Sequence, residues 1–213
     1  VLFALDTAGA VRGLVRVPIR ARDWEDVSAA RCPSGPCLYL ADIGDNGRVR
    51  QRIYIYRVPE PEPAQGETAP PEVFSATYAD GPHNAEAMFL LGDDLFIVTR
   101  DRVGAIYHAT VNETRALTFQ HIGRLGLAAV TDGEASPDGR SVVVRTSHEA
   151  VIYRAEDLTR GGDTPYLRIP IDGLREAQGE GVALNGRMLY LASEGRPWNR
   201  AGQLLSMRCD LLE

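Results

Sequence analysis

Short runs that alternate apolar and polar residues, or that are rich in β-branched residues, recur along the chain, and the periodicity of helices is nearly absent. Four segments with a common pattern begin at Asp23, Asn84, Asp132 and Gln178. In each segment a Glu follows two positions later, and then come a turn signal and an alternating or β-branched run. We therefore expect four copies of one β-hairpin unit.

Further strands follow each hairpin. A third strand is expected at 52–58, 104–111, 150–158 and 202–209, and a fourth at 73–79, 117–123 and 166–171. The proline-rich segment 59–72 indicates an extended loop. Residues 1–20 contain two more strand-like runs, which match the third and fourth strands of a preceding unit.

Four short antiparallel strands that recur every ~45–50 residues are typical of β-propeller blades. We predict an all-β fold in which residues 1–213 form one propeller domain. The expected blades cover 1–20 (partial), 23–79, 84–125, 132–171 and 178–209. A closed ring of five four-stranded blades needs about 20 strands, so we expect a five-bladed propeller that is incomplete at its termini. Six blades would require more missing sequence, and a β-sandwich is the alternative fold.

Composition narrows the class of protein. The chain has 213 residues, 44% of them hydrophobic and 24% charged, which suits one sizeable core. Its net charge of −6 argues against nucleic acid as a partner, and no apolar run reaches the length of a membrane span. All 23 basic residues are arginine. A GC-rich genome is the simpler explanation of this bias, and selection for forked hydrogen-bond donors is the alternative.

Three cysteines bear on the cellular compartment. Cys32 and Cys37 flank a Pro-Ser-Gly-Pro turn, and a hairpin there would bring their sulfur atoms together. A disulfide between them predicts an oxidising, extracytoplasmic location. A zinc site is the weaker alternative, because no other Cys or His lies near this pair. Cys209 has no evident partner; it is either a buried free thiol or paired outside this chain.

The repeated Glu begins the innermost strand of each blade, and strand alternation turns the residue two positions earlier the same way. Two tiers of polar side chains should therefore meet near the mouth of the central channel. They are Glu25, Glu86, Glu134 and Glu180 in one tier, and Asp23, Asn84, Asp132 and Gln178 in the other. Carboxylate and amide oxygens suit a hard divalent cation, with Ca²⁺ the first choice. Alternatively, each Glu ties its strand to the next blade by accepting backbone N–H groups.

The ends of the second strands lie on the same face of the ring. They carry Asp42, Asp45, Asn46, Arg100, Arg145, His148, Glu194 and Arg196. One interpretation is a pocket for a small anionic or polyhydroxylated ligand, in which arginine anchors the ligand and acids bind metal or act as bases. Salt bridges between blades are the alternative. The catalytic candidates are His83, His148 and Asp42, since G-x-S-x-G, H-E-x-x-H and Walker motifs are absent.

Five segments together resemble a known group of proteins: WEDV, YLADIGDN, IYIYRVPEP, DGEASPDGRSVVVRT and QGEGVAL. They are similar to a group of secreted bacterial β-propeller proteins of uncharacterised function, and more distantly to esterase-like phytase and gluconolactonase-type propellers. The resemblance implies a divalent cation that polarises an ester or phosphoester, with Glu25, Glu86, Glu134 and Glu180 at the corresponding positions. This chain departs from that pattern in its arginines at the neighbouring strand ends.

Two hypotheses of function follow. The first is a secreted propeller that binds a divalent cation and a small polar or anionic ligand at the channel, and hydrolyses an ester, lactone or phosphoester. The second is a non-catalytic binding or scaffold module at the cell surface, whose ring of charges is structural.

Overall fold

The computed structural model describes residues 1–174, 176, 178–195 and 202–210, and within them the chain forms 17 strands in five consecutive groups. The first group is a hairpin of β1 (Leu2–Leu5) and β2 (Val11–Val15). Three groups have four strands each: β3 (Asp26–Cys32), β4 (Gly35–Asp42), β5 (Ile53–Pro59) and β6 (Glu72–Tyr78); β7 (Ala85–Leu91), β8 (Asp94–Thr99), β9 (Ala105–Thr110) and β10 (Ala116–Arg124); β11 (Val130–Ala135), β12 (Ser141–Thr146), β13 (Glu149–Arg154) and β14 (Leu167–Pro170). The last group is β15 (Gln178–Asn185), β16 (Met188–Glu194) and β17 (Gln203–Arg208).

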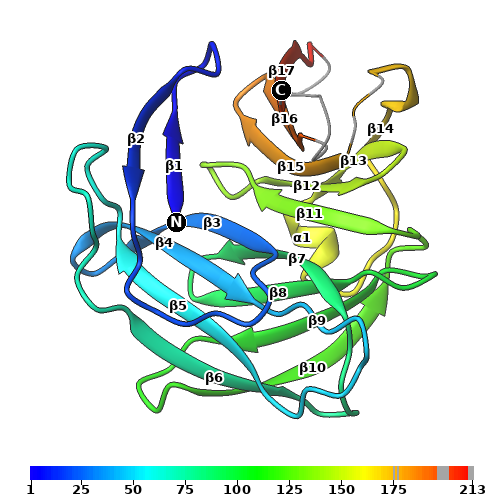
Figure 1. Cartoon of the computed structure of the whole chain (residues 1–213). Helices are drawn as coiled ribbons and strands as arrows, with labels where there is room; N and C mark the ends of the chain where they lie inside the picture. The colour runs from blue at the N-terminus through cyan, green and yellow to red at the C-terminus, as the bar shows by residue number, and fades with distance from the viewer. Residues whose placement is uncertain (175, 177, 196–201, 211–213) are drawn as a thin grey trace.

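Each group is an antiparallel meander, and the groups follow one another around a common centre (Figure 1). The first strands β3, β7, β11 and β15 pack against their successors, which makes them the innermost strands. This radial arrangement is that of a β-propeller. The predicted fold class is therefore confirmed.

Two local features differ from the predicted strands. The strand expected at 150–158 ends at Arg154, and Ala155–Leu158 forms the short helix α1. Ala, Glu and Leu favour helix, two acids lie in its first turn, and Ala155 and Leu158 are buried. In addition, the first half of β10 pairs in parallel with β6 and its second half pairs with β9. Strand β10 thereby joins two groups into one eight-stranded sheet.

The hydrophobic core lies mainly between neighbouring groups of strands. Ile55 and Phe74 of the first four-stranded group pack with Met88 and Ile97 of the second. Similar clusters join the second group to the third and the third to the last. Each sheet is thus held by its neighbours, which is how sheets stacked around an axis bury both faces.

The cysteine prediction is confirmed. Cys32 and Cys37 form a disulfide that closes the β3–β4 hairpin, with Cα atoms 5.9 Å apart. Cys209 is a free, buried thiol, and burial raises its pKa. A disulfide is typical of proteins outside the reducing cytoplasm. Among the described residues, none of the helices has the length and apolar character to cross a membrane.

Candidate functional site

Hairpin register places the repeated Glu residues at two different positions. Counted from the hairpin turn, Glu86 of β7 and Glu180 of β15 both fall at a bulge opposite the end of the second strand. In β11 the bulge falls at Thr131, so Glu134 lies three residues further along. The negative charges of Glu86 and Glu180 both help to raise the pKa of Glu25. The structure therefore groups Glu25, Glu86 and Glu180, and sets Glu134 apart.

A cavity of about 820 Å³ lies between the innermost strands and the β1–β2 hairpin. Its acidic lining residues are Glu25, Asp26, Glu60, Asp132, Glu134 and Glu180. Its apolar lining includes Leu2, Val15, Trp24, Leu40, Leu184 and Leu204. Of the residues that the structure describes, no arginine or histidine lines this cavity. We call it the acidic cavity.

Asp26 and Asp132 form a hydrogen-bonded pair of carboxyl groups at the wall of the acidic cavity. Asp132 also accepts the backbone N–H of Gly133 (2.8 Å) and of Val182, and Asp26 accepts that of Met88 (2.6 Å). Burial raises the pKa of Asp132 to about 6, and burial and the charge of Asp132 raise the pKa of Asp26 well above its usual range. The two carboxyl groups therefore share a proton.

Two further carboxyl groups of the acidic cavity have raised pKa values. Burial and the charge of Asp132 raise the pKa of Glu134 to about 8, although its neighbour Ser28 opposes the shift. Burial and nearby acids raise the pKa of Glu25 to about 8, although Arg100 opposes the shift. Like charges in a partly dry site favour protonation, so a positive charge that enters would displace protons.

Glu86 is neutralised by Arg100. The two side chains form an ion pair in which the Glu86 side chain is 6% exposed and the Arg100 side chain 34%. Burial still raises the pKa of Glu86. Arg100 therefore neutralises an acid of its own hairpin, β7–β8, rather than an acid of another blade.

Asp42, Asp45 and Asn84 belong to a buried network that fixes two loops. Asp42 accepts the backbone N–H of Arg22 (3.1 Å) and of Asp23 (2.9 Å), and pairs with Arg50 at 2.9 Å. Asn84 accepts the backbone N–H of Asp45 (2.6 Å), and its amide lies 3.5 Å from Asn46. These side chains hold the loop that carries Asp23 and Glu25 beside the channel.

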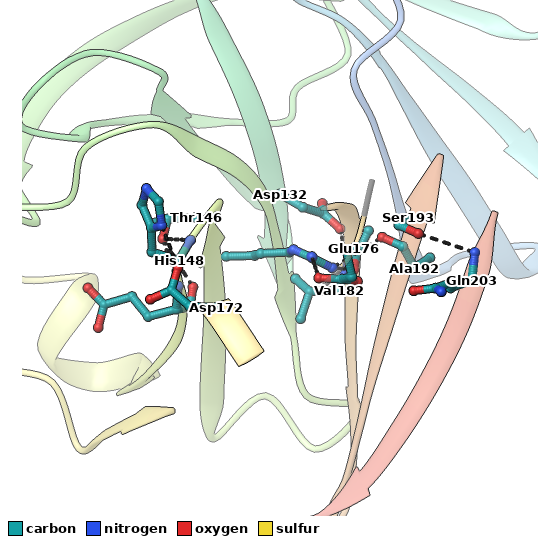
Figure 2. Close-up of polar contacts among 12 residues, drawn as sticks. Asp132, Thr146, His148, Asp172, Glu176, Val182, Ala192, Ser193 and Gln203 are labelled. Atoms are coloured by element: carbon teal, nitrogen blue, oxygen red, sulfur yellow. Dashed lines mark hydrogen bonds and ion pairs between the residues drawn. The ribbon is translucent and has the colours of Figure 1, made fainter. Parts of the chain in front are cut away.

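Arg145 occupies a slot between the third four-stranded group and the last group. It is fully buried, donates to the carbonyl groups of Gly181 (2.8 Å) and Ala192 (3.1 Å), and pairs with Glu176. A side chain at Gly179 would overlap its guanidinium group. Figure 2 shows Glu176, Val182 and Ala192 gathered around this slot, with Asp132 beside Val182. Arg145 therefore joins two sheets and does not line the acidic cavity.

The two histidine candidates lie in separate surroundings. His83 contacts Asp80 (3.0 Å) and the Tyr107 hydroxyl (2.8 Å) and packs edge-on against Tyr78. His148 is exposed and pairs with Asp172 at 2.6 Å, apart from the group around Asp132 in Figure 2. Neither lines the acidic cavity.

The remaining predicted residues fall at the end of β16. Glu194 is its last residue, is exposed, and pairs across the sheet with Gln178. Arg196 lies outside the described residues.

The donor chemistry of the acidic cavity suits a hard cation, since carboxyl oxygens are what Ca²⁺ prefers. Within the described ranges, however, no three His, Cys, Asp or Glu side chains converge closely enough to hold a metal ion. The side chains as they stand therefore do not form a ready-made metal centre.

Asp26 is a member of the site that sequence reasoning missed. It directly follows Glu25 and opens β3, so the D-x-E pattern drew attention to its neighbours. Asp26 and Asp132 occupy equivalent positions, because each accepts a backbone N–H from the inner strand of the following group. Counted from their turns, however, the two residues differ, because Asp26 lies six residues before the end of β3 and Asp132 three residues before the end of β11, so a comparison of the hairpins would not have aligned them.

No protein-family model and no curated protein sequence matches the chain. Solved structures resemble it distantly. A tail fiber of Staphylococcus aureus phage P68 is 12% identical over 92% of this chain and 38% of that chain, with a TM-score of 0.51. The periplasmic gluconolactonase PpgL of Pseudomonas aeruginosa is 12% identical over 97% and 63%, with a TM-score of 0.48. The Dos1 propeller is 10% identical over 89% and 46%, with a TM-score of 0.43.

This chain spans less than two thirds of the length of each of these structures. At such identities a likeness speaks for the fold alone. The chain is a β-propeller protein with a distant similarity to other propeller proteins.

Proposed function

We propose that this propeller binds a small cation in the acidic cavity. The observation that carries the proposal is the lining itself: six carboxyl groups and no basic side chain among the described residues, in a cavity of about 820 Å³. An anionic ligand would meet repulsion there, whereas a cation would offset the burial and the nearby negative charges that raise the pKa values of Glu25 and Glu134.

The apolar part of the lining favours an organic ammonium ion over a bare metal ion. Leu40, Leu184 and Trp24 face the same space as the carboxyl groups. Ligand cavities typically combine such apolar walls with a few polar groups that set orientation. An amine on a short apolar or aromatic group would satisfy both walls, with its ammonium group among the carboxyl groups of the lining.

A calcium ion is the second source of positive charge. The resemblance to gluconolactonase-type propellers favours it, and Glu25, Glu180 and Asp23 would be its ligands after a local rearrangement. Hydrolysis of an ester, lactone or phosphoester belongs to this second proposal, because it requires the metal. We also propose an extracytoplasmic location, supported by the Cys32–Cys37 disulfide.

Calorimetric titration at pH 6.5 and pH 9 tests the proposal. The probes are benzylamine, its neutral analogue benzyl alcohol, and calcium chloride. At pH 9 we expect benzylamine to bind more tightly than benzyl alcohol, because ionised Glu25 and Glu134 attract the ammonium group. For the same reason we expect the affinity for benzylamine to be higher at pH 9 than at pH 6.5. Since half of benzylamine loses its charge near pH 9, tetramethylammonium chloride serves as a probe of fixed charge. Binding by calcium chloride alone, with hydrolysis of a lactone, would favour the metal proposal.

Matched variants locate the binding. Glu134→Gln should weaken the binding of tetramethylammonium at pH 9 by roughly three- to tenfold, as expected for the loss of ~1 kcal/mol of charge attraction. Glu62→Gln, in the exposed loop after β5, should leave it unchanged. If no cation binds, or if both variants have equal effects, the proposal is wrong.

A further inference from the structure

A second pocket, of about 540 Å³, is built from two loops and strand β5 of the first four-stranded group. The first loop leads into β3 and carries Arg20 and Arg22. The second loop, between β4 and β5, carries Arg50 and Arg52, and β5 contributes Tyr54 and Tyr56. Asp42, Val49 and Gln51 complete the lining. We call it the arginine pocket.

The arginine pocket has a strong positive charge. Its lining contains four arginines and one acid, Asp42. That acid is already neutralised, because Arg50 pairs with it at 2.9 Å and two backbone N–H groups donate to it. In a protein whose net charge is −6, four arginines around one pocket are an unusual concentration of positive charge.

Three of these guanidinium groups have no acid partner. In the described part of the chain, the side chains of Arg20, Arg22 and Arg52 form no ion pair, and all three residues are exposed. Unpaired guanidinium groups that face one space repel each other unless an anion lies between them. Each fork can donate two hydrogen bonds to an oxyanion, which a lysine could not match.

Two tyrosines form the wall beside the arginines. Tyr54 and Tyr56 point to the same face of β5, with ring centroids 6.4 Å apart and an angle of 25° between the rings. Tyr56 is buried at 7% exposure, whereas Tyr54 is half-buried. An aromatic wall next to a charged mouth suits a ligand that carries a ring beside its anionic group.

We propose that the arginine pocket binds a phosphate or sulfate group attached to an aromatic ring. Arg20, Arg22 and Arg52 would surround the tetrahedral anion, and Tyr54 would contact the ring. A tetrahedral oxyanion presents three free oxygen atoms to three forks, whereas a carboxylate presents only two. This site is separate from the acidic cavity: Asp42 and the other lining residues of the arginine pocket do not line that cavity.

Titration of the full chain with phenyl phosphate, phenyl sulfate, inorganic phosphate and phenol tests the proposal, with calorimetry as the measurement. Phenyl phosphate or phenyl sulfate should bind most tightly, inorganic phosphate more weakly, and phenol least. A preference for one of the two esters identifies the source of the oxyanion. Equal binding of phenol and both esters would overturn the proposal, as would the absence of binding by either ester.

Variants assign the binding to the pocket. The double variant Arg20→Ala and Arg52→Ala should weaken the binding of the preferred ester at least tenfold at constant ionic strength. Arg102→Ala removes an exposed arginine from the turn between β8 and β9, which does not line the pocket, and should have less than a twofold effect. Arg52→Lys keeps the charge and removes the fork, so an intermediate loss is expected. If Arg102→Ala weakens binding as much as the double variant, the effect is one of net charge and the proposal is wrong.

Discussion

The acidic cavity and the arginine pocket lie on either side of one short segment, residues 20–26, yet their charged groups behave differently. Arg20 and Arg22 belong to the arginine pocket, whereas Glu25 and Asp26 belong to the acidic cavity. The arginines are exposed to water. The carboxyl groups are crowded and partly desolvated, and their pKa values rise. Opposite charges a few residues apart thus lie in different surroundings: the arginines face water, and the carboxyl groups lie in a partly desolvated cavity.

Asp42 keeps the two sites apart. It accepts the backbone N–H groups of Arg22 and Asp23, at the point where the segment passes from one site to the other. Its ion pair with Arg50 is almost fully buried, with side-chain exposures of 2% and 3%. The buried Asp42 carboxylate therefore fixes the loop that carries Arg22 and Asp23, and it also pairs with the charge of Arg50.

The largest effect is expected from Asp42→Ala, which would break this division. The change leaves Arg50 buried without its partner and frees two backbone N–H groups. Removal of one member of a buried ion pair typically costs about 3–5 kcal/mol of the free energy of unfolding. Urea denaturation should detect this loss, and the binding of both cations and aryl phosphates should weaken. The exposed Asp163→Ala is the control, with a change near zero. Similar losses in both variants would contradict the role given to Asp42.

An intermediate effect is expected from Glu134→Gln, which tests whether burial really suppresses charge in the acidic cavity. The pKa of Glu134 is raised to about 8 from an ordinary value of 4.5, so the folded state holds a proton that the unfolded state releases. This group therefore stabilises the fold fully below pH 4.5, and its contribution is lost as the pH rises through 8. The wild type should become less stable over that range.

Because glutamine cannot ionise, Glu134→Gln should remove part of this pH dependence. At pH 9 the variant should be more stable than the wild type by at least ~1 kcal/mol, or about 2–4 °C in melting temperature. At pH 4 the two proteins should melt within about 1 °C of each other. Thermal melts followed by circular dichroism at both pH values provide the measurement. Glu62→Gln should melt like the wild type at either pH, and a variant that is less stable at pH 9 would disprove the raised pKa.

Much of the fold could be predicted from the sequence, because strand alternation and turn residues are local signals. The number of strands in each segment was predictable, and so was the disulfide, since both depend on hairpins. The partition of charges was harder to predict. Whether Glu134 aligns with Glu86 depends on one bulge in β11 and on turn length, and neither has a clear mark in the sequence. The contacts of Arg145 depend on how two sheets pack, which no local pattern encodes.

The smallest effect is expected from Asp26→Asn, and an almost unchanged free energy of unfolding is the informative result. If Asp26 holds the shared proton, asparagine can replace it at little cost: the amide N–H donates to Asp132 as the carboxylic acid did, the amide oxygen accepts the Met88 N–H, and only the local contact with the backbone N–H of the adjacent Val27 is lost. The stability at pH 7 should change by less than ~0.5 kcal/mol.

Asp132→Asn is the matched contrast. Its carboxylate accepts from Gly133, Val182 and Asp26, and an amide would turn a donor toward one of these donors, at a cost of about 1–3 kcal/mol. Urea denaturation of both variants at pH 7 measures the difference. Equal losses of stability would mean that the proton is not bound preferentially to either carboxyl group. A larger loss for Asp26→Asn would place the proton on Asp132.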